Sequence, residues 1–131
     1  MTKKTIRLPS SRVYSDEADL MKAVKDWLEP QERDGIKVLR ICDRYAKGYS
    51  DLFICVRGIF VVAELKDDTG KPTKHQLDFI KQMCAAGAIG GVCRSVKDVA
   101  DLVEQAKEIS YERRLEYADS DTLRSGLQSA T

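Results

Sequence analysis

Two short apolar runs separated by two residues are the strongest feature of the hydrophobic pattern. Leu52–Val56 and Ile59–Ala63 are almost continuously apolar, and Arg57-Gly58 stands between them. Runs of this length around a short connection containing Gly are typical of two buried antiparallel strands in a β-hairpin. If Arg57 and Gly58 form the whole turn, the residue numbers of each facing pair sum to 115.

The register of this hairpin decides where two carboxylates lie. With the two-residue turn, Asp51 lies directly opposite Glu64 and both point to the same face. Arginine disfavours the positive φ that such a turn needs at its first position. A three-residue loop with a glycine bulge is therefore an alternative, and it would shift the register by one residue. Asp51 and Glu64 would then face opposite sides of the sheet.

The first register predicts a site for a cation. Facing residues of an antiparallel pair have Cβ atoms about 4.5–5.5 Å apart, and like charges there repel unless a positive charge lies between them. A divalent cation would satisfy both carboxylates. Strand alternation puts Lys66 on the same face as Glu64 and leaves the Leu65 backbone carbonyl close by. Two acids, an amine and a carbonyl would thus share one pocket.

Apolar residues at helical spacing predict three helices around the hairpin. These helices span Ser15 to about Glu29, Thr73 to about Ala86, and Ser95 to about Ile109. Short apolar segments predict two further strands, at residues 37–42 and 88–94. The second of these follows a strand and a helix, which implies a parallel neighbour. The expected fold class is α/β, a mixed sheet flanked by helices.

The ends of these helices carry recognisable signals. Ser15, Thr73 and Ser95 are good N-cap residues. Pro30 is expected to end the first helix, with a loop after it, and Gly87 to close the second. The inner face of the last helix is expected to comprise Val96, Val99, Val103 and Ala106.

Two polar residues in these helices admit both a structural and a chemical interpretation. Glu17 lies on the inward stripe of the first helix, where it could offer a carboxylate or only complement the helix dipole. Gln76 lies three residues after Thr73, so it could complete a capping box. It also lies on the inward face of its helix, where a bound anion is favoured at the N-terminus. The residues alone leave both interpretations open.

The order of these motifs resembles a known nuclease superfamily. Gly48-Tyr49-Ser50-Asp51, an apolar hairpin, Glu64-Leu65-Lys66 and then Gln76 at a helix start are similar to the PD-(D/E)XK pattern, specifically its VRR-NUC (virus-type replication-repair nuclease) branch. Residues 17 to about 99 can be aligned with that pattern. The short pieces are individually weak, but hairpin, spacing and helix together are more specific. Ser50 stands where the superfamily has proline, a departure that touches no ligand.

The resemblance implies a restriction-endonuclease-like fold and metal-dependent hydrolysis of DNA phosphodiesters. It assigns one Mg²⁺, replaceable by Mn²⁺, to Asp51, Glu64 and the Leu65 carbonyl. Lys66 would orient or deprotonate the attacking water. Gln76 would position water or phosphate, and Glu17 would support water or a second ion.

Charge neither excludes nor demands a nucleic-acid partner. The chain has 22 basic and 21 acidic residues, a net charge of +1, whereas nucleic-acid-binding domains often have a pI above about 9. Basic residues nevertheless flank the hairpin. We expect them to form a phosphate-binding rim, with a solvated loop surface as the alternative. The rim comprises Arg40, Arg44, Lys47, Lys71 and Lys74.

Length and composition fit a single globular unit of 131 residues, with 43% hydrophobic and 33% charged residues. No apolar stretch approaches the roughly 20 residues of a membrane span, and the first residues lack the apolar core of a signal peptide. We therefore expect a cytoplasmic protein without membrane contact. The expected division is an arm at 1–14, a nuclease domain at 15–109 and an extension at 110–131, where periodicity fades and the helix is expected to fray.

The four cysteines lack the close-paired spacing of zinc sites and lie in apolar segments. We interpret them as reduced core residues. They are Cys42, Cys55, Cys84 and Cys93.

The resemblance implies a structure-selective DNA endonuclease, acting on branched DNA such as four-way (Holliday) junctions. Two alternatives remain: a catalytically inactive nucleic-acid-binding module on the same fold, and an unrelated α/β domain in which Glu64 and Lys66 form a strand-end ion pair. Symmetric junction cutting needs two sites, so the resemblance to stand-alone phage-type proteins implies a homodimer. Its interface is expected at Ile109, Tyr111, Leu115 and Tyr117, unless these residues cover their own domain or stay disordered.

Overall fold

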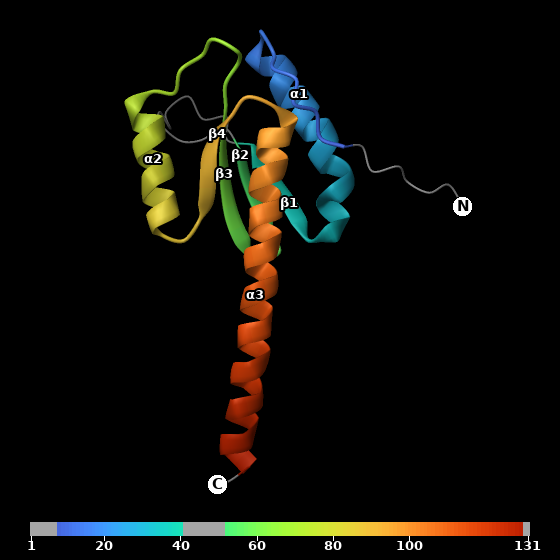
Figure 1. Ribbon diagram of the computed structural model, residues 1–131, viewed down its shortest axis with the longest axis vertical. Coiled ribbons are helices and arrows are strands. Elements are labelled where there is room, and N and C mark those ends of the chain that lie inside the picture. Colours follow the sequence, from blue (N-terminus) through green and yellow to red (C-terminus); the bar gives the residue numbers. More distant parts are fainter. Residues whose placement is uncertain (1–7, 41–51, 130–131) are drawn as a thin grey trace, which may run out of the picture.

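The computed structural model describes residues 8–40 and 52–129, and the side chains of residues 8–39 and 52–120. Within these residues, one sheet has the strand order β1-β2-β3-β4 (Figure 1). Its strands are β1 (Ile36–Arg40), β2 (Leu52–Val56), β3 (Ile59–Leu65) and β4 (Ile89–Cys93). The first three strands run antiparallel, and β4 runs parallel to β3. The predicted mixed sheet, the parallel neighbour and the α/β class are confirmed.

The turn between β2 and β3 has two residues. Arg57 has φ 49° and Gly58 has φ 87°, the pair of positive values that a type I′ turn requires. The facing pairs run from Val56 with Ile59 to Leu52 with Ala63. Every described pair therefore follows the predicted sum of 115, and the bulged alternative is wrong. Asp51 lies outside the described residues, so its pairing with Glu64 stays a prediction.

Hydrogen bonds explain why arginine is tolerated in the strained position. The Arg57 backbone N–H donates to the Gly35 carbonyl at 2.8 Å, and its Nε donates to the Asp34 carbonyl at 3.2 Å. The Arg57 carbonyl accepts a 2.7 Å bond from the Ser110 hydroxyl. These bonds offset the cost of a non-glycine residue at positive φ, which is on the order of 1 kcal/mol or more.

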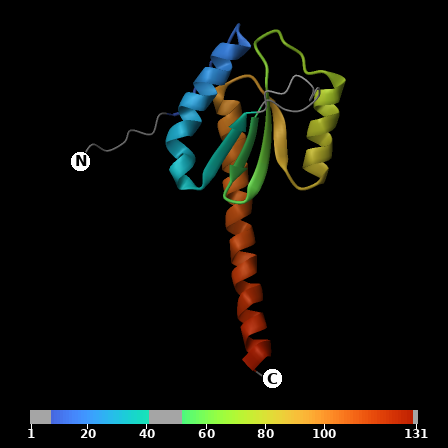
Figure 2. The same ribbon diagram turned by 180° about the vertical axis from the view of Figure 1, so that it is seen from behind.

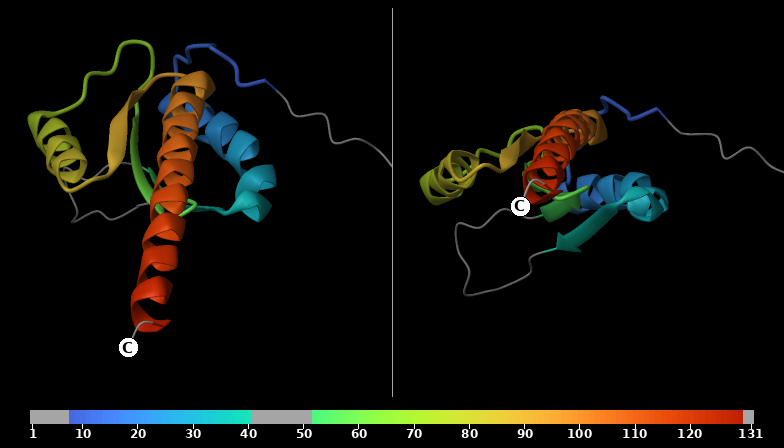
Figure 3. Two further views of the ribbon diagram at one scale, coloured as in Figure 1. Left: turned by 60° about the horizontal axis from the view of Figure 1, so that its bottom comes forward. Right: turned by 90° about the horizontal axis from the view of Figure 1, so that it is seen from below.

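The two faces of the sheet have different covers. Helices α1 (Glu17–Leu28) and α3 (Val96–Ser129) lie on one side of the sheet, and α2 (Lys74–Ala85) lies beside β4 (Figures 2 and 3). On the other face Phe53 of β2 stacks on Phe79 of α2, with ring centroids 5.9 Å apart. The core against α1 and α3 includes Leu20, Val24, Leu28, Leu52, Ile54, Val61, Leu65, Val99 and Val103.

The first helix begins and ends differently from the prediction. Asp16, not Ser15, is the N-cap, because its side chain accepts a 2.7 Å bond from the Ala18 N–H. The α-helix ends at Leu28, and Pro30 lies in a 3₁₀-helix, η1 (Glu29–Asp34), where a loop was expected. Proline is tolerated in a first helical turn because its missing N–H has no partner there.

The second and third helices start as predicted. Thr73 caps α2, and Gly87, just beyond its end, has φ 105°. Ser95 accepts a 3.2 Å bond from the Asp98 N–H at the start of α3. The predicted inner face of α3 is buried, from Val96 to Ala106.

The extent of α3 corrects the expected fraying after residue 109. The helix continues to Ser129 and projects well beyond the sheet (Figure 1). The side chains of residues 111–120 are exposed all around the helix. The apolar periodicity of the sequence fades here because the helix no longer has a buried face, and not because the helix ends. Within the described parts of the chain, no helix combines the length and apolar character needed to cross a membrane.

The cysteines divide into two groups. Cys93 is buried, and burial raises the pKa of its thiol to about 12, with further contributions from Asp98, Glu64 and Asp101. Cys55 and Cys84 are free but exposed, so assigning them to the core was wrong. Cys55 points away from the face that α1 and α3 cover, and apolar neighbours in sequence do not show which face a residue occupies. Cys42 lies outside the described residues.

Two adjacent glycines in β4 provide a test of the packing of β4 against β3. A Cβ on Gly90 would lie 2.3 Å from a Val62 methyl carbon and 3.0 Å from the Val62 carbonyl, whereas one on Gly91 would meet nothing nearer than Leu102 at 4.0 Å. We expect Gly90→Ala to lower the free energy of unfolding by about 1–3 kcal/mol. Gly91→Ala is the control and should change it by less than about 1 kcal/mol. Urea denaturation measures both, and equal effects would contradict the packing described.

Candidate functional site

The site is built around Glu64, a charged residue inside the sheet. Its side chain is 0% exposed, although the residue carries a carboxylate. Leu65, the next residue, packs into the core against α1 and α3, so alternation turns Glu64 to the opposite face. Glu64 pairs with Val92 of the parallel strand β4. Because β3 is an inner strand of the sheet, Glu64 is buried even though it lies near the end of that strand.

Lys66 supplies a positive charge to this carboxylate. Its Nζ lies 3.3 Å from Glu64 Oε1, and the exposed fractions of the two side chains are 13% and 0%. The strand-end ion pair considered from the sequence is thus present, but it is not a surface pair. Removing charges from water costs several kcal/mol per ion, which such a pair offsets only in part. Desolvated charges of this kind are concentrated at functional sites.

The backbone after β3 is held by two different segments, the end of β4 and the residues just before α1. The Lys66 N–H donates to the Cys93 carbonyl at 3.0 Å, and the Asp68 N–H donates to the Tyr14 carbonyl at 2.8 Å. The Arg94 guanidinium donates to the Asp67 carbonyl at 2.6 Å. The chain that carries Lys66 is therefore fixed at successive residues.

The Asp67 side chain closes the turn that follows. Its Oδ1 accepts bonds from the Gly70 N–H at 2.6 Å and the Thr69 N–H at 3.2 Å. A carboxylate that caps the amides two and three residues ahead of it forms a compact Asx turn. This turn directs the chain from the site toward the start of α2.

Gln76 makes the capping-box hydrogen bonds with Thr73 that its structural interpretation predicted. Its Oε1 accepts a 2.9 Å bond from the Thr73 N–H, and its own N–H donates to the Thr73 hydroxyl at 3.2 Å. The capping box is complete. The bond to Thr73 uses the amide oxygen of Gln76 and not its NH₂ group, so a role in positioning water or phosphate remains a prediction.

Glu17 is half-buried at the first residue of α1. The bond between Asp68 and Tyr14 brings the chain just before α1 to the end of β3. The start of α1 and the Glu64–Lys66 pair thus belong to the same end of the molecule. The role of Glu17 toward water or a second ion remains a prediction.

The donor chemistry fits a hard cation but the described residues form only part of a site. Among them, no group of three or more His, Cys, Asp or Glu residues is arranged to hold a metal ion. Glu64 supplies a carboxylate and Leu65 a backbone carbonyl, the oxygen ligands that Mg²⁺ prefers. Asp51, the further predicted ligand, lies outside the described residues.

The predicted basic rim is described only in part. Lys71 and Lys74 are exposed; Lys71 lies between the Asp67 turn and α2, and Lys74 is the first residue of α2. Arg40 ends β1, but its side chain is not among those described. Arg44 and Lys47 lie outside the described residues.

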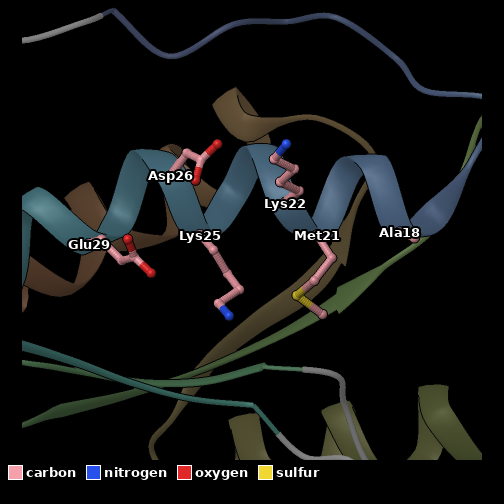
Figure 4. Close-up of a pocket in the computed structure, with 6 residues that line it drawn as sticks. All are labelled: Ala18, Met21, Lys22, Lys25, Asp26 and Glu29. Carbon is pink, nitrogen blue, oxygen red and sulfur yellow. The ribbon is translucent and has the colours of Figure 1, made fainter.

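The surface also has a pocket that is separate from this site. It has a volume of about 230 Å³ and lies along α1 (Figure 4). Its lining mixes both signs of charge and includes none of the candidate site residues. The lining residues are Ala18, Met21, Lys22, Lys25, Asp26 and Glu29.

Sequence reasoning missed Arg94, which it placed only at the end of a strand. The predicted parallel pairing of the strand at 88–94 could have indicated its proximity to the site, because the carboxyl ends of parallel strands meet at one edge of a sheet. The residue after β4 is thereby brought next to the residues after β3.

Comparisons with known proteins agree with this architecture. No family model matches the sequence, and no curated protein does so either. Among solved structures, one described as "VRR_NUC domain" superposes with a TM-score of 0.53 and is 31% identical, covering 67% of this chain and 94% of its own. A second, "VRR_NUC domain protein", has a TM-score of 0.55 and 19% identity, covering 69% and 86%. The second supports the fold alone.

The first relative is similar over nearly all of its length. The mixed sheet with flanking helices is a restriction-endonuclease-like fold. The chain belongs to the VRR-NUC domain family.

Proposed function

We propose that this protein is a metal-dependent DNA endonuclease that hydrolyses phosphodiester bonds, selectively in branched DNA such as four-way junctions. The observation that carries the proposal is a fully buried glutamate whose carboxylate lies 3.3 Å from a lysine amine. An apolar residue at this inner-strand position would avoid the desolvation cost. The presence of a charged glutamate at this position is explained if its carboxylate takes part in the reaction.

The proposed metal ligands are Asp51, Glu64 and the Leu65 carbonyl. Every described pair of the hairpin follows the register from which the facing of Asp51 and Glu64 was derived. Bound Mg²⁺ or Mn²⁺ would supply Lewis-acid activation of the phosphate and of the attacking water. Oxygen donors without thiolate or imidazole favour these hard cations over zinc.

The chain's own residues then divide the remaining work. Lys66 orients or deprotonates the water and offsets negative charge on the phosphate. Its backbone anchoring to Cys93 limits where the amine can lie, which matters because catalysis depends on orientation. Glu17 supports water or a second ion, and the NH₂ group of Gln76 positions water or phosphate. The displacement is in line, with the water oxygen forming the new P–O bond as the opposite P–O bond breaks.

Recognition of DNA relies on a local basic surface rather than on net charge. Exposed Lys71 lies between β3 and α2, and exposed Lys74 is the first residue of α2. Arg40, Arg44 and Lys47 are assigned to the same rim. Phosphate contacts of this kind position a duplex without reading its sequence, as a structure-selective enzyme requires.

A catalytically inactive binding module on the same fold is the second candidate. Such a module needs the basic rim but has no use for a buried carboxylate beside an amine. The Glu64–Lys66 pair therefore favours the enzyme.

We also propose that two copies assemble through the projecting part of α3. Tyr111, Leu115 and Tyr117 are 65%, 52% and 67% exposed there. Ile109 instead packs against its own core, so it is removed from the expected interface. A helix without tertiary packing is marginal in water. Pairing with a second copy would stabilise it and supply the second site that symmetric junction cutting needs.

Removing site chemistry should abolish cleavage. We expect Asp51→Asn, Glu64→Gln and Lys66→Ala each to lower the rate on labelled four-way junctions by about 10²–10⁴-fold, because each removes a ligand or the water-directing amine. A chelator should abolish the wild-type activity and Mg²⁺ or Mn²⁺ restore it. Cleavage by any of the three variants at the wild-type rate would contradict the assignment.

Stability measurements separate chemistry from folding in these variants. Lys66→Ala takes a positive partner from a buried carboxylate and should lower the free energy of unfolding by about 1–3 kcal/mol. The double variant Glu64→Gln/Lys66→Met should recover much of that loss, because it also removes the buried charge. It should nevertheless remain inactive. A stable, active double variant would show that the pair is only structural.

DNA affinity should fall with salt. For duplex DNA the slope of log K against log salt is about −0.9 per neutralised phosphate. Lys71→Ala/Lys74→Ala should make this slope shallower by about 2. Lys22→Ala/Lys25→Ala, with the same charge loss on α1, is the control and should leave it unchanged. Fluorescence anisotropy between 50 and about 200 mM salt measures the slopes, and equal slopes in both variants would refute the assigned rim.

Light scattering tests the assembly. We expect a mass twice the single-chain 14.7 kDa at micromolar concentration. Tyr111→Ser/Leu115→Ser should return the protein to a single chain, because it removes two of the three exposed apolar side chains assigned to the interface. Leu8→Ser, another exposed apolar site, is the control and should stay dimeric. A single-chain mass for the wild type, with and without DNA, would exclude the dimer.

A further inference from the structure

The end of β4 is tied to the segment that carries Lys66 through both backbone and side chain. The Cys93 carbonyl accepts the Lys66 N–H at 3.0 Å. One residue later, the Arg94 guanidinium donates to the Asp67 carbonyl at 2.6 Å, across 27 positions of sequence. Arg94 thus contacts the residue directly after Lys66.

Arg94 is itself held in place at its backbone. Its N–H donates to Asp98 Oδ2 at 2.9 Å, and the Asp98 N–H donates to the Ser95 hydroxyl at 3.2 Å. These two bonds join Arg94 and Ser95 to Asp98 at the start of α3, whose inner face is buried in the core. The guanidinium therefore projects from a rigid base, a requirement for precise positioning of a site.

A hydrogen bond to the Asp67 carbonyl restrains the peptide that follows Lys66. Lys66 is the first residue after β3, so the sheet fixes its amide through Cys93 but not the peptide that follows. The Asp67 side chain is occupied by the amides of Thr69 and Gly70. The bond from Arg94 fixes the carbonyl of the same residue, and with it the direction in which the chain leaves Lys66.

We propose that Arg94 is a positioning residue: its hydrogen bond to the Asp67 carbonyl holds the Lys66 amine in its place beside Glu64. The inference rests on the proposed function in treating Lys66 as the residue that directs the water. Arg94 needs no contact with substrate in this role. It acts through the backbone, and its loss leaves every candidate ligand in the chain.

A different role for Arg94 would be direct contact with a DNA phosphate. A phosphate contact would weaken DNA binding when it is lost and would flatten the salt dependence. A positioning role would lower kcat and leave binding nearly unchanged, because the lost interaction matters in the transition state. Turnover and affinity therefore distinguish the two roles.

Amide hydrogen exchange tests the positioning without any enzyme assay. Arg94→Met keeps the length of the side chain but removes its donors. We expect exchange at the Asp68 amide, which donates to Tyr14, to accelerate by about tenfold or more, while amides of the β2–β3 ladder change by less than about twofold. Arg57→Met, which removes a bond to the Asp34 carbonyl at the hairpin turn, is the matched control. It should leave Asp68 exchange unchanged.

Kinetics supply the second readout. Arg94→Met should lower kcat by about 10–100-fold, the effect of a small misplacement, with an unchanged DNA dissociation constant and salt slope. Arg94→Lys, which retains a donor and the charge, should recover part of kcat and of the Asp68 protection. Arg57→Met should turn over at the wild-type rate.

The outcomes separate this inference from the proposed function. Unchanged Asp68 exchange in Arg94→Met would overturn the positioning role, and so would a rise in the dissociation constant with kcat intact. If the wild-type protein cleaves no DNA, the proposed function fails. The exchange experiment would still decide whether Arg94 fixes the chain beside Lys66.

Discussion

The carboxylate of Glu64, on the inner strand β3, is completely buried from water. A charge in such a position is tolerated only when opposite charge or strong hydrogen bonds compensate for lost hydration. Strand alternation provides part of the answer, because it returns Lys66 to the same face two residues later. Further contacts at this end of the molecule fix the backbone that carries this amine.

The parallel pairing of β3 and β4 accounts for much of that support. In a parallel pair both carboxyl ends lie at one edge, so Cys93 and Arg94 meet the residues that follow Leu65. The required crossover is α2, whose N-terminal cap then lies downstream of the site. The buried turns of α3 fix the other side of the same edge. Local stability and site geometry are therefore provided by the same elements.

The errors in the sequence interpretation share a physical origin. Apolar context suggested that Cys55 and Cys84 are core residues, yet burial depends on which face a neighbouring element covers. The fading of periodicity after Ser110 suggested fraying, yet a helix can continue without a buried face. Ser15 and Asp16 are both suitable N-cap residues for α1, and only the backbone conformation in the folded chain makes Asp16 the N-cap. Tertiary context overrides local preference in each case.

The sequence by itself determined the hairpin and the inward face of α3, because these depend on local spacing and turn chemistry. It left two hairpin registers and two roles for Gln76 open, and the structure showed the two-residue turn and the complete capping box at Thr73. The sequence also placed Glu64 and Lys66 on one face. Only the tertiary structure decided that Glu64 is completely buried, that Lys66 is anchored by Cys93, and that Arg94 reaches Asp67. Those contacts join segments distant in the chain, and no local pattern encodes the packing that brings them together.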